Sequence, residues 1–191
     1  MSRGAGGGPG PGGAPAGTHG AGTHGAGTEE LSRSSARVAE ELRRLGADCE
    51  VKEMPDSTRT AADAAAALGC SVAQIVKSLV FRSVAADEAV LVLLSGADRV
   101  DEGRLAEVVG EEVEQATGKF VRARTGFAIG GVPPVAHSEP IATYLDEHLL
   151  DHALVWAAAG TPRAVFSIGP ADLVRVTSAR VVAVAATAAT A

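Results

Sequence analysis

The fold is decided by the stretch Gln74-Ile75-Val76-Lys77-Ser78-Leu79-Val80-Phe81-Arg82. Its β-branched and apolar residues predict a strand. Alternate residues of a strand share a face, and the apolar residues of this stretch occupy both faces. We therefore expect a central strand that is covered by other parts of the protein on both sides.

Lys77 lies in the middle of this strand. A desolvated ammonium without a partner is costly, so a lysine in this place shifts its pKa, finds a partner or opens into a cleft. In the structural alternative, the stem packs along the sheet while the ammonium reaches solvent or pairs with a carboxylate. The strand pattern leaves both interpretations open.

The composition indicates one domain with a tail, or at most two small domains, because the chain has 191 residues of which 46% are hydrophobic. No apolar run approaches the ~18 residues that a membrane span needs. The first residues lack an apolar signal region, so we expect a soluble cytoplasmic protein without a membrane partner. Cys49 and Cys70 match no zinc or redox spacing and indicate small core residues in a reducing compartment.

The charge balance argues against extensive nucleic-acid binding. The net charge is −6, and only 3% of the residues are aromatic. A bulk electrostatic grip on a nucleic-acid backbone and a stacking platform for bases are therefore not expected, and DNA is not an expected partner. The basic patch Lys119–Arg124 is typical of a solvated face, so any contact with RNA must be short and local.

The sequence divides into three parts by composition. Residues 1–28 are rich in Gly, Ala and Pro, and predict a disordered tail because they cannot bury enough apolar surface to offset their conformational entropy. Residues 29–186 are expected to form the folded domain. Residues 187–191 are expected to be frayed.

Within the domain, hairpins alternate with short helices. An alanine-rich helix should end at Gly69, a hairpin should span residues 75–94, and Asp101 should cap a helix that ends at Gly110. A short acidic helix is expected over Glu111–Gln115. This order predicts an α+β (mixed α/β) fold with a curved, mainly antiparallel or mixed central sheet, partly barrel-like and flanked by short helices.

Two glycine-containing loops stand out. Gly130-Gly131 lies between short apolar runs and is followed by Pro133-Pro134, while Gly160-Thr161-Pro162 joins two predicted strands. Adjacent glycines indicate either a tight structural turn or a backbone that a ligand approaches closely, and both interpretations stay open. The nucleotide-binding pattern G-x-G-x-x-G is absent.

Hydrolytic machinery of the usual kinds is hard to assemble from this sequence. There is no G-x-S-x-G motif. His148 and His152 lie four residues apart, but the H-E-x-x-H motif is absent and no third ligand is evident, so neither a metal nor a cofactor is expected. An ammonium beside a glycine-loop nest of N–H groups can hold a phosphate or a developing oxyanion, which suits hydrolysis of an activated ester.

Four segments together resemble one known family. They are Thr60–Cys70, Gln74–Phe81, Thr125–Pro134 and Ala158–Pro162. Their order and spacing are similar to those of the prolyl-tRNA synthetase editing-domain family, which includes free-standing YbaK-type aminoacyl-tRNA deacylases. The resemblance runs from about residue 32 to about residue 186 and excludes the tail.

The resemblance implies roles for particular residues. Lys77 matches the essential lysine of the family, expected to hold the phosphate end of the terminal adenosine and to orient the ester. Gly130, Gly131 and Pro134 belong to a segment that matches the GxxxP loop lining the family's pocket. Gly160 and Thr161 match a second pocket segment. His137 and Asp146 lie near further pocket positions of the family.

The resemblance also implies an activity. It implies hydrolysis, in trans, of a mischarged small amino acid from the 3′ CCA end of a tRNA, with an aminoacyl-tRNA synthetase as a further partner. The family generally lacks a protein nucleophile, so a water activated by the ribose 2′-hydroxyl or by the substrate is implied. The alternatives are a non-catalytic module of the same fold that binds aminoacyl-adenosine or a nucleotide, and a structural interaction protein.

Overall fold

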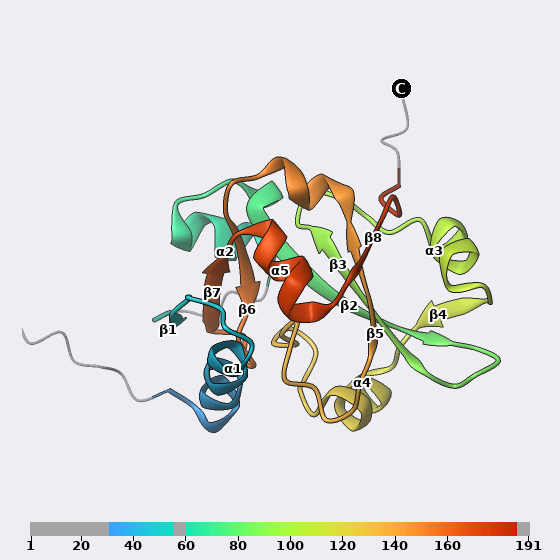
Figure 1. Cartoon of the computed structure of the whole chain (residues 1–191), viewed down its shortest axis with the longest axis horizontal. Helices are drawn as coiled ribbons and strands as arrows, with labels where there is room; N and C mark the ends of the chain where they lie inside the picture. Colours follow the sequence, from blue (N-terminus) through green and yellow to red (C-terminus); the bar gives the residue numbers. More distant parts are fainter. Residues whose placement is uncertain (1–30, 56–59, 187–191) are drawn as a thin grey trace, which may run out of the picture.

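The computed structural model describes residues 31–55 and 60–186, and Figure 1 shows its arrangement. The predictions of a disordered tail over 1–28 and of frayed residues 187–191 lie outside the described residues. No helix in the described ranges is both long and apolar enough to cross a membrane. The elements, in sequence order, are α1 (Arg33–Arg44), β1 (Val51–Glu53), α2 (Ala61–Leu68), η1 (Val72–Gln74), β2 (Ile75–Ser83), β3 (Ala89–Ser95), α3 (Glu102–Val109), β4 (Val113–Gln115), α4 (Gly118–Thr125), β5 (Ala142–Asp146), η2 (Glu147–Asp151), β6 (Val155–Ala158), β7 (Ala164–Ile168), α5 (Pro170–Thr177) and β8 (Arg180–Val182).

The strands form one mixed sheet. Its order is β1-β7-β6-β2-β3-β5-β8, and β4 pairs with β2 beside this path. The β2–β6, β3–β5 and β5–β8 pairs are parallel, and the remaining pairs are antiparallel. The predicted mixed sheet with flanking short helices is confirmed. The described strands do not close into a barrel, because β1 and β8 stand at opposite ends of the order.

The predicted hairpin lies at the centre of the sheet. β2 and β3 are antiparallel neighbours, with Val76 opposite Ser95 and Arg82 opposite Ala89. Every residue of β3 is buried, as its apolar run Ala89–Leu94 predicts. β2 is buried at its two ends but only half-buried from Lys77 to Val80. The middle of a central strand is thus accessible, which marks the position of the site.

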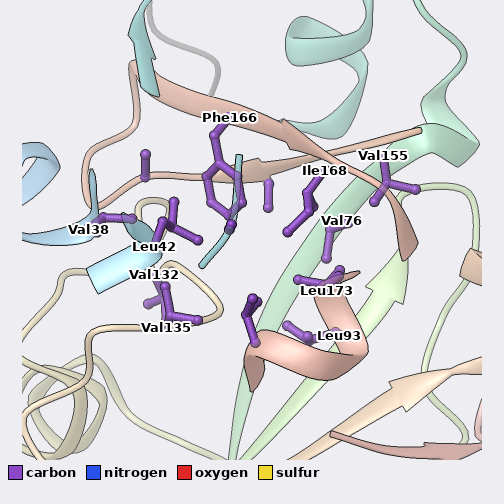
Figure 2. Packing of buried hydrophobic residues seen from close by; sticks show 14 of the residues in the cluster. Val38, Leu42, Val76, Leu93, Val132, Val135, Val155, Phe166, Ile168 and Leu173 are labelled. Atoms are coloured by element: carbon purple, nitrogen blue, oxygen red, sulfur yellow. The ribbon is translucent and has the colours of Figure 1, made fainter. Parts of the chain in front are cut away.

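Two hydrophobic clusters pack against the sheet. The larger one joins α1, α5, the 132–135 segment and the strands β6 and β7. Figure 2 shows Val38 and Leu42 of α1 near Phe166, and Leu173 of α5 near Leu93. The second cluster contains side chains of β2, β3, α3 and β4. β2 contributes to both clusters, as the sequence predicts for a strand that is apolar on both faces.

The helix before β2 is fixed by its own caps. The hydroxyl of Thr60 accepts the N–H of Asp63, and the Asp63 carboxylate accepts the N–H of Thr60, which makes a capping box. Gly69 ends the helix in the left-handed conformation, with a φ of 66°. Ala64 and Ala65 are buried beside Ile75, because a face of small side chains lets α2 lie close to β2.

The prediction of a helix over Glu111–Gln115 is wrong. Residues Val113–Gln115 form β4, which pairs antiparallel with Phe81–Ser83. The local sequence is acidic and short, so its intrinsic preference is weak and the open edge of β2 decides its structure. Val113 is buried in the second cluster as a result.

Asp146 ends β5 and is almost fully buried, with 1% of its surface exposed. One carboxylate oxygen accepts the N–H groups of Val184 and Ala185, both at 2.8 Å. The other oxygen accepts the N–H of His148 at 3.1 Å. The carboxylate therefore fastens the segment after β8 to the sheet.

Replacing Asp146 with Ala should lower the free energy of unfolding by about 3 kcal/mol, since each unpaired buried N–H costs roughly 1–3 kcal/mol. The exposed Asp151, five residues further along the sequence, is the matched control, and its change to Ala should stay within about 0.5 kcal/mol. Urea unfolding measures both variants. A loss below about 1 kcal/mol in D146A would contradict this role.

Candidate functional site

A cavity of about 330 Å³ lies beside the half-buried middle of β2. Its walls come from α2, β2, β6 and the segment 129–132, and most of them are apolar. Ala61 and Ala64 of α2 and Ala157 and Ala158 of β6 are among the lining residues. Small side chains from both elements leave room for a small ligand group, and the cavity is at the small end of the range for ligand sites, roughly 300–1,000 Å³.

Lys77 is the one cationic residue among the described residues that line this cavity. Its ammonium donates a hydrogen bond to the backbone carbonyl of Asp98, in the turn after β3. Burial lowers the pKa of Lys77, and Arg99 lowers it further, whereas the charge of Asp98 raises it. A carbonyl partner leaves the positive charge uncompensated by direct ion pairing, so the charge is available to an anionic or polar ligand.

Ser78 also lines the cavity, although it lies on the opposite face of β2 from Lys77. Its hydroxyl oxygen is buried and has no hydrogen-bond partner among the described residues. Ser78 is not among the site residues predicted from the sequence. The available signal was a single hydroxyl in an otherwise apolar stretch, next to the lysine.

The two glycine loops meet at the cavity. Gly130 and Thr161 both line it. Gly131 does not line it but packs behind, where an added Cβ would lie 2.8 Å from both the Cα and the carbonyl carbon of Thr161. Gly130 has a φ of 89°, a left-handed conformation that favours glycine, and the N–H of Gly131 closes the turn on the carbonyl of Ala128 at 3.1 Å.

Gly160 has a packing role and does not line the cavity. Its φ is 93°, and an added Cβ would lie 2.9 Å from the carbonyl oxygen of Ser34 and 3.0 Å from Phe127. The Thr161 hydroxyl accepts the N–H of Ala164 at 3.1 Å, which fixes the turn into β7. Gly160 thus lets this turn pack against α1 and Phe127, while Thr161, the next residue of the turn, lines the cavity.

Pro134 and His137 lie elsewhere. Both line a second, open hollow between α1, the 134–141 segment and the end of α5. His137 donates through Nε2 to the carbonyl of Pro133 at 2.7 Å, and burial lowers the pKa of its ring. The structure therefore separates Pro134 and His137 from the cavity that contains Lys77.

Asp146 lines neither hollow, and its carboxylate holds the segment after β8 in place. Its neighbour His148 lies with Nδ1 3.0 Å from a carboxylate oxygen of Asp98, and this hydrogen bond raises the pKa of His148. One ligand atom from each of Asp98, Asp146 and His148 lies within 4.8 Å of the others. The Asp146 oxygens already accept backbone N–H groups, so the cluster has a structural role. Its hydrogen bond between His148 and the Asp98 carboxylate holds the turn whose Asp98 carbonyl accepts from Lys77.

An exposed apolar residue lies at the entrance of the cavity, and neither cysteine of the protein reaches it. Ile129 lines the cavity mouth and is 63% exposed, so an apolar residue stands at the entrance. Neither Cys49 nor Cys70 lines the cavity, and burial raises the pKa of both thiols. Within residues 31–55 and 60–186, no His, Cys, Asp or Glu lines it.

Comparisons with known proteins agree on one family. The sequence model described as the aminoacyl-tRNA editing domain matches residues 55–176. The uncharacterized protein YwhH of Bacillus subtilis is 29% identical over 124 residues, which are 65% of this chain and 78% of that protein. The proline–tRNA ligase of Limosilactobacillus fermentum is 30% identical over 112 residues, 56% of this chain and 20% of the ligase.

One solved structure extends this likeness over most of the protein. It is described as "a putative trans-editing enzyme for prolyl tRNA synthetase" and is 48% identical, with a TM-score of 0.79. The match covers 83% of this chain and all of that one.

Gly131→Ala should disturb the contact between the two glycine loops, because its Cβ would overlap the backbone of Thr161. We expect the free energy of unfolding to fall by about 1–3 kcal/mol, as for other overpacked sites. Gly103→Ala, at an exposed position of α3, is the control and should leave stability unchanged or raise it by up to about 1 kcal/mol. Equal unfolding midpoints in the two variants would contradict the contact.

Proposed function

The chain belongs to the aminoacyl-tRNA editing domain family, and from this we propose that it is a trans-acting deacylase of mischarged aminoacyl-tRNA. The substrate is the ester of a small amino acid at the 3′ end of a tRNA. The observation that supports this most strongly is the half-buried ammonium of Lys77 in a small apolar cavity beside Gly130 and Thr161.

The cavity fits one end of such a substrate. Its volume accommodates a small aminoacyl group, while the nucleotides must stay at the mouth. The alanine-lined walls can take an apolar group, and Lys77 can meet the phosphate or ester oxygens. The rim residue Ile129 is placed to contact the sugar or base of the terminal nucleotide.

In the proposed reaction, the oxygen of a water attacks the ester carbonyl carbon. The bond from that carbon to the ribose oxygen then breaks, a proton of the attacking water passes to the ribose oxygen, and the products are a free amino acid and a tRNA with its hydroxyl restored. No general base is evident among the described lining residues, so the ribose 2′-hydroxyl of the substrate orients the water and relays its proton to the leaving oxygen. Lys77 orients the ester and stabilises developing negative charge.

The surface charge supports a limited contact with the nucleic acid. A net charge of −6 gives no general attraction to the tRNA backbone. We therefore propose that the protein contacts the CCA end alone, and that an aminoacyl-tRNA synthetase is a further partner. The relationship to a domain within a proline–tRNA ligase supports this partner class.

The second candidate is a binding module of the same fold that holds an aminoacyl-adenosine or a nucleotide without turnover. The same cavity supports it, because an ammonium and apolar walls bind a ligand whether or not it reacts. A purely structural role for Lys77 is disfavoured, since its ammonium contacts a carbonyl beside a cavity and has no buried carboxylate among the described residues as its hydrogen-bond partner.

Deacylation of tRNAs charged with Ala, Ser, Thr, Cys and Pro tests the proposal. We expect the wild type to hydrolyse one or two of them, and Lys77→Ala to lose about 10²-fold or more, because the positioned charge is removed. Lys52→Ala, at an exposed position of β1, is the matched control and should keep the wild-type rate. Thermal unfolding should show that Lys77→Ala remains folded.

Full activity in Lys77→Ala would overturn the role of this residue. No hydrolysis of any substrate by the wild type would overturn the enzyme and favour the binding module. Binding of an aminoacyl-adenosine analogue, measured by calorimetry, would then decide between that module and a structural protein.

A further inference from the structure

The edge of β2 that faces away from β3 is only partly paired. β6 pairs with Ile75 and Val76, and β4 pairs with Phe81–Ser83. The three residues Lys77–Leu79 have no strand partner on this edge among the described strands, and Val80 accepts a backbone hydrogen bond there from Ala116, just after β4. The cavity lies in this interruption, which explains how residues from both faces of β2 line it.

Backbone hydrogen bonds show which residues point toward the open edge. The carbonyl of Ile75 accepts the N–H of Gly96 at 2.7 Å, and the N–H of Ser83 donates to Glu88 at 2.9 Å. Both bonds lie on the β3 side. Because N–H and C=O directions alternate along an antiparallel strand, Ser78 directs both of its backbone groups to the opposite edge.

Two further bonds agree with this assignment. The carbonyl of Val80 accepts the N–H of Ala116 at 3.2 Å, and the N–H of Val84 donates to Glu112 at 2.9 Å. Val80 and Val84 therefore form these backbone hydrogen bonds on the edge away from β3, toward which the even-numbered residues direct their N–H and C=O groups. Ser78 lies in the same series, at a place where no described strand pairs with it on the edge away from β3.

Ser78 therefore offers three hydrogen-bonding groups at the cavity. Its N–H and C=O face the open edge, and its buried hydroxyl has no partner among the described residues. A buried polar group without a partner is unfavourable, so a ligand that supplies the partner is stabilised. The geometry is that of a strand edge open to pairing with a single residue.

We propose that Ser78 binds the α-amino acid part of the substrate as a one-residue β-bridge, a proposal that rests on the deacylase function above. The Ser78 carbonyl accepts from the α-ammonium, while the Ser78 N–H and hydroxyl donate to the ester carbonyl oxygen. One α-amino acid carries both groups in the spacing that a paired strand residue has. The site thus recognises the part common to all amino acids, and the apolar walls contact the variable group.

This assignment predicts selectivity for a free α-amino group. Acetylation removes the positive charge and adds bulk where the Ser78 carbonyl would accept. N-acetyl-aminoacyl-tRNA should therefore be hydrolysed at least about tenfold more slowly than the same tRNA with its amino group free. Lys77 is assigned to the phosphate and ester oxygens and not to the α-ammonium, so the preference for a free amine does not depend on its role.

The experiment measures kcat/KM for the preferred aminoacyl-tRNA and its N-acetylated form in four proteins. Ser78→Ala should lose about tenfold or more on the free-amine substrate because one donor to the carbonyl oxygen is gone. Ser78→Thr, which keeps the hydroxyl, should restore most of the rate. Ser167→Ala, a half-buried serine of β7 away from the cavity, should equal the wild type.

Each outcome decides the proposal. Hydrolysis of both tRNA forms at equal rates, or an unchanged rate in Ser78→Ala, overturns the bridge while the deacylase function stands. If the wild type hydrolyses neither form, calorimetry with an amide-linked aminoacyl-adenosine and its N-acetyl form replaces the rate assay. Preferential binding of the free amine, weakened in Ser78→Ala, supports the bridge, and equal or absent binding overturns it.

Discussion

Hydrogen bonding along β2 is continuous with β3 on one edge and interrupted on the other. The interruption exists because β6 pairs no further than Val76 and β4 begins its pairing only at Phe81. The backbone N–H and C=O groups of a central strand are otherwise all hydrogen-bonded to the neighbouring strands on both sides. The gap is what allows Lys77 and Ser78 to reach a ligand from within the hydrophobic core.

The surrounding elements keep this gap from collapsing. α2 packs its alanine face beside Ile75, and the capping box at Thr60 fixes where that helix begins. On the other side, Gly131 is in close contact with Thr161, so the two loops support one another.

The turn that receives the Lys77 ammonium is itself held by the hydrogen bond between the Asp98 carboxylate and His148. The site is therefore built on caps and loop contacts around the β2–β3 hairpin.

The sequence sufficed for the parts that local pattern encodes. The apolar stretch around Lys77 predicted the central hairpin, and the alanine-rich run ending at Gly69 predicted the helix before it. Parts that depend on distant partners could not be predicted in this way. β4 is a strand because β2 offers it an edge, and the role of Ser78 depends on the missing strand partner beside it, which no local pattern encodes. Pro134 and His137 follow the glycine loop in sequence, yet they line another hollow.

The central claim is that the open edge at Ser78 receives the aminoacyl end of the ligand. The most direct measurement is the NMR titration of ¹⁵N-labelled protein with a small aminoacyl-adenosine analogue in which an amide replaces the ester. The account predicts that the amide signals of Ser78 and Gly130 shift on binding while that of Ser167 does not. Shifts confined to His137 and its neighbours would place the ligand in the second hollow and contradict the account.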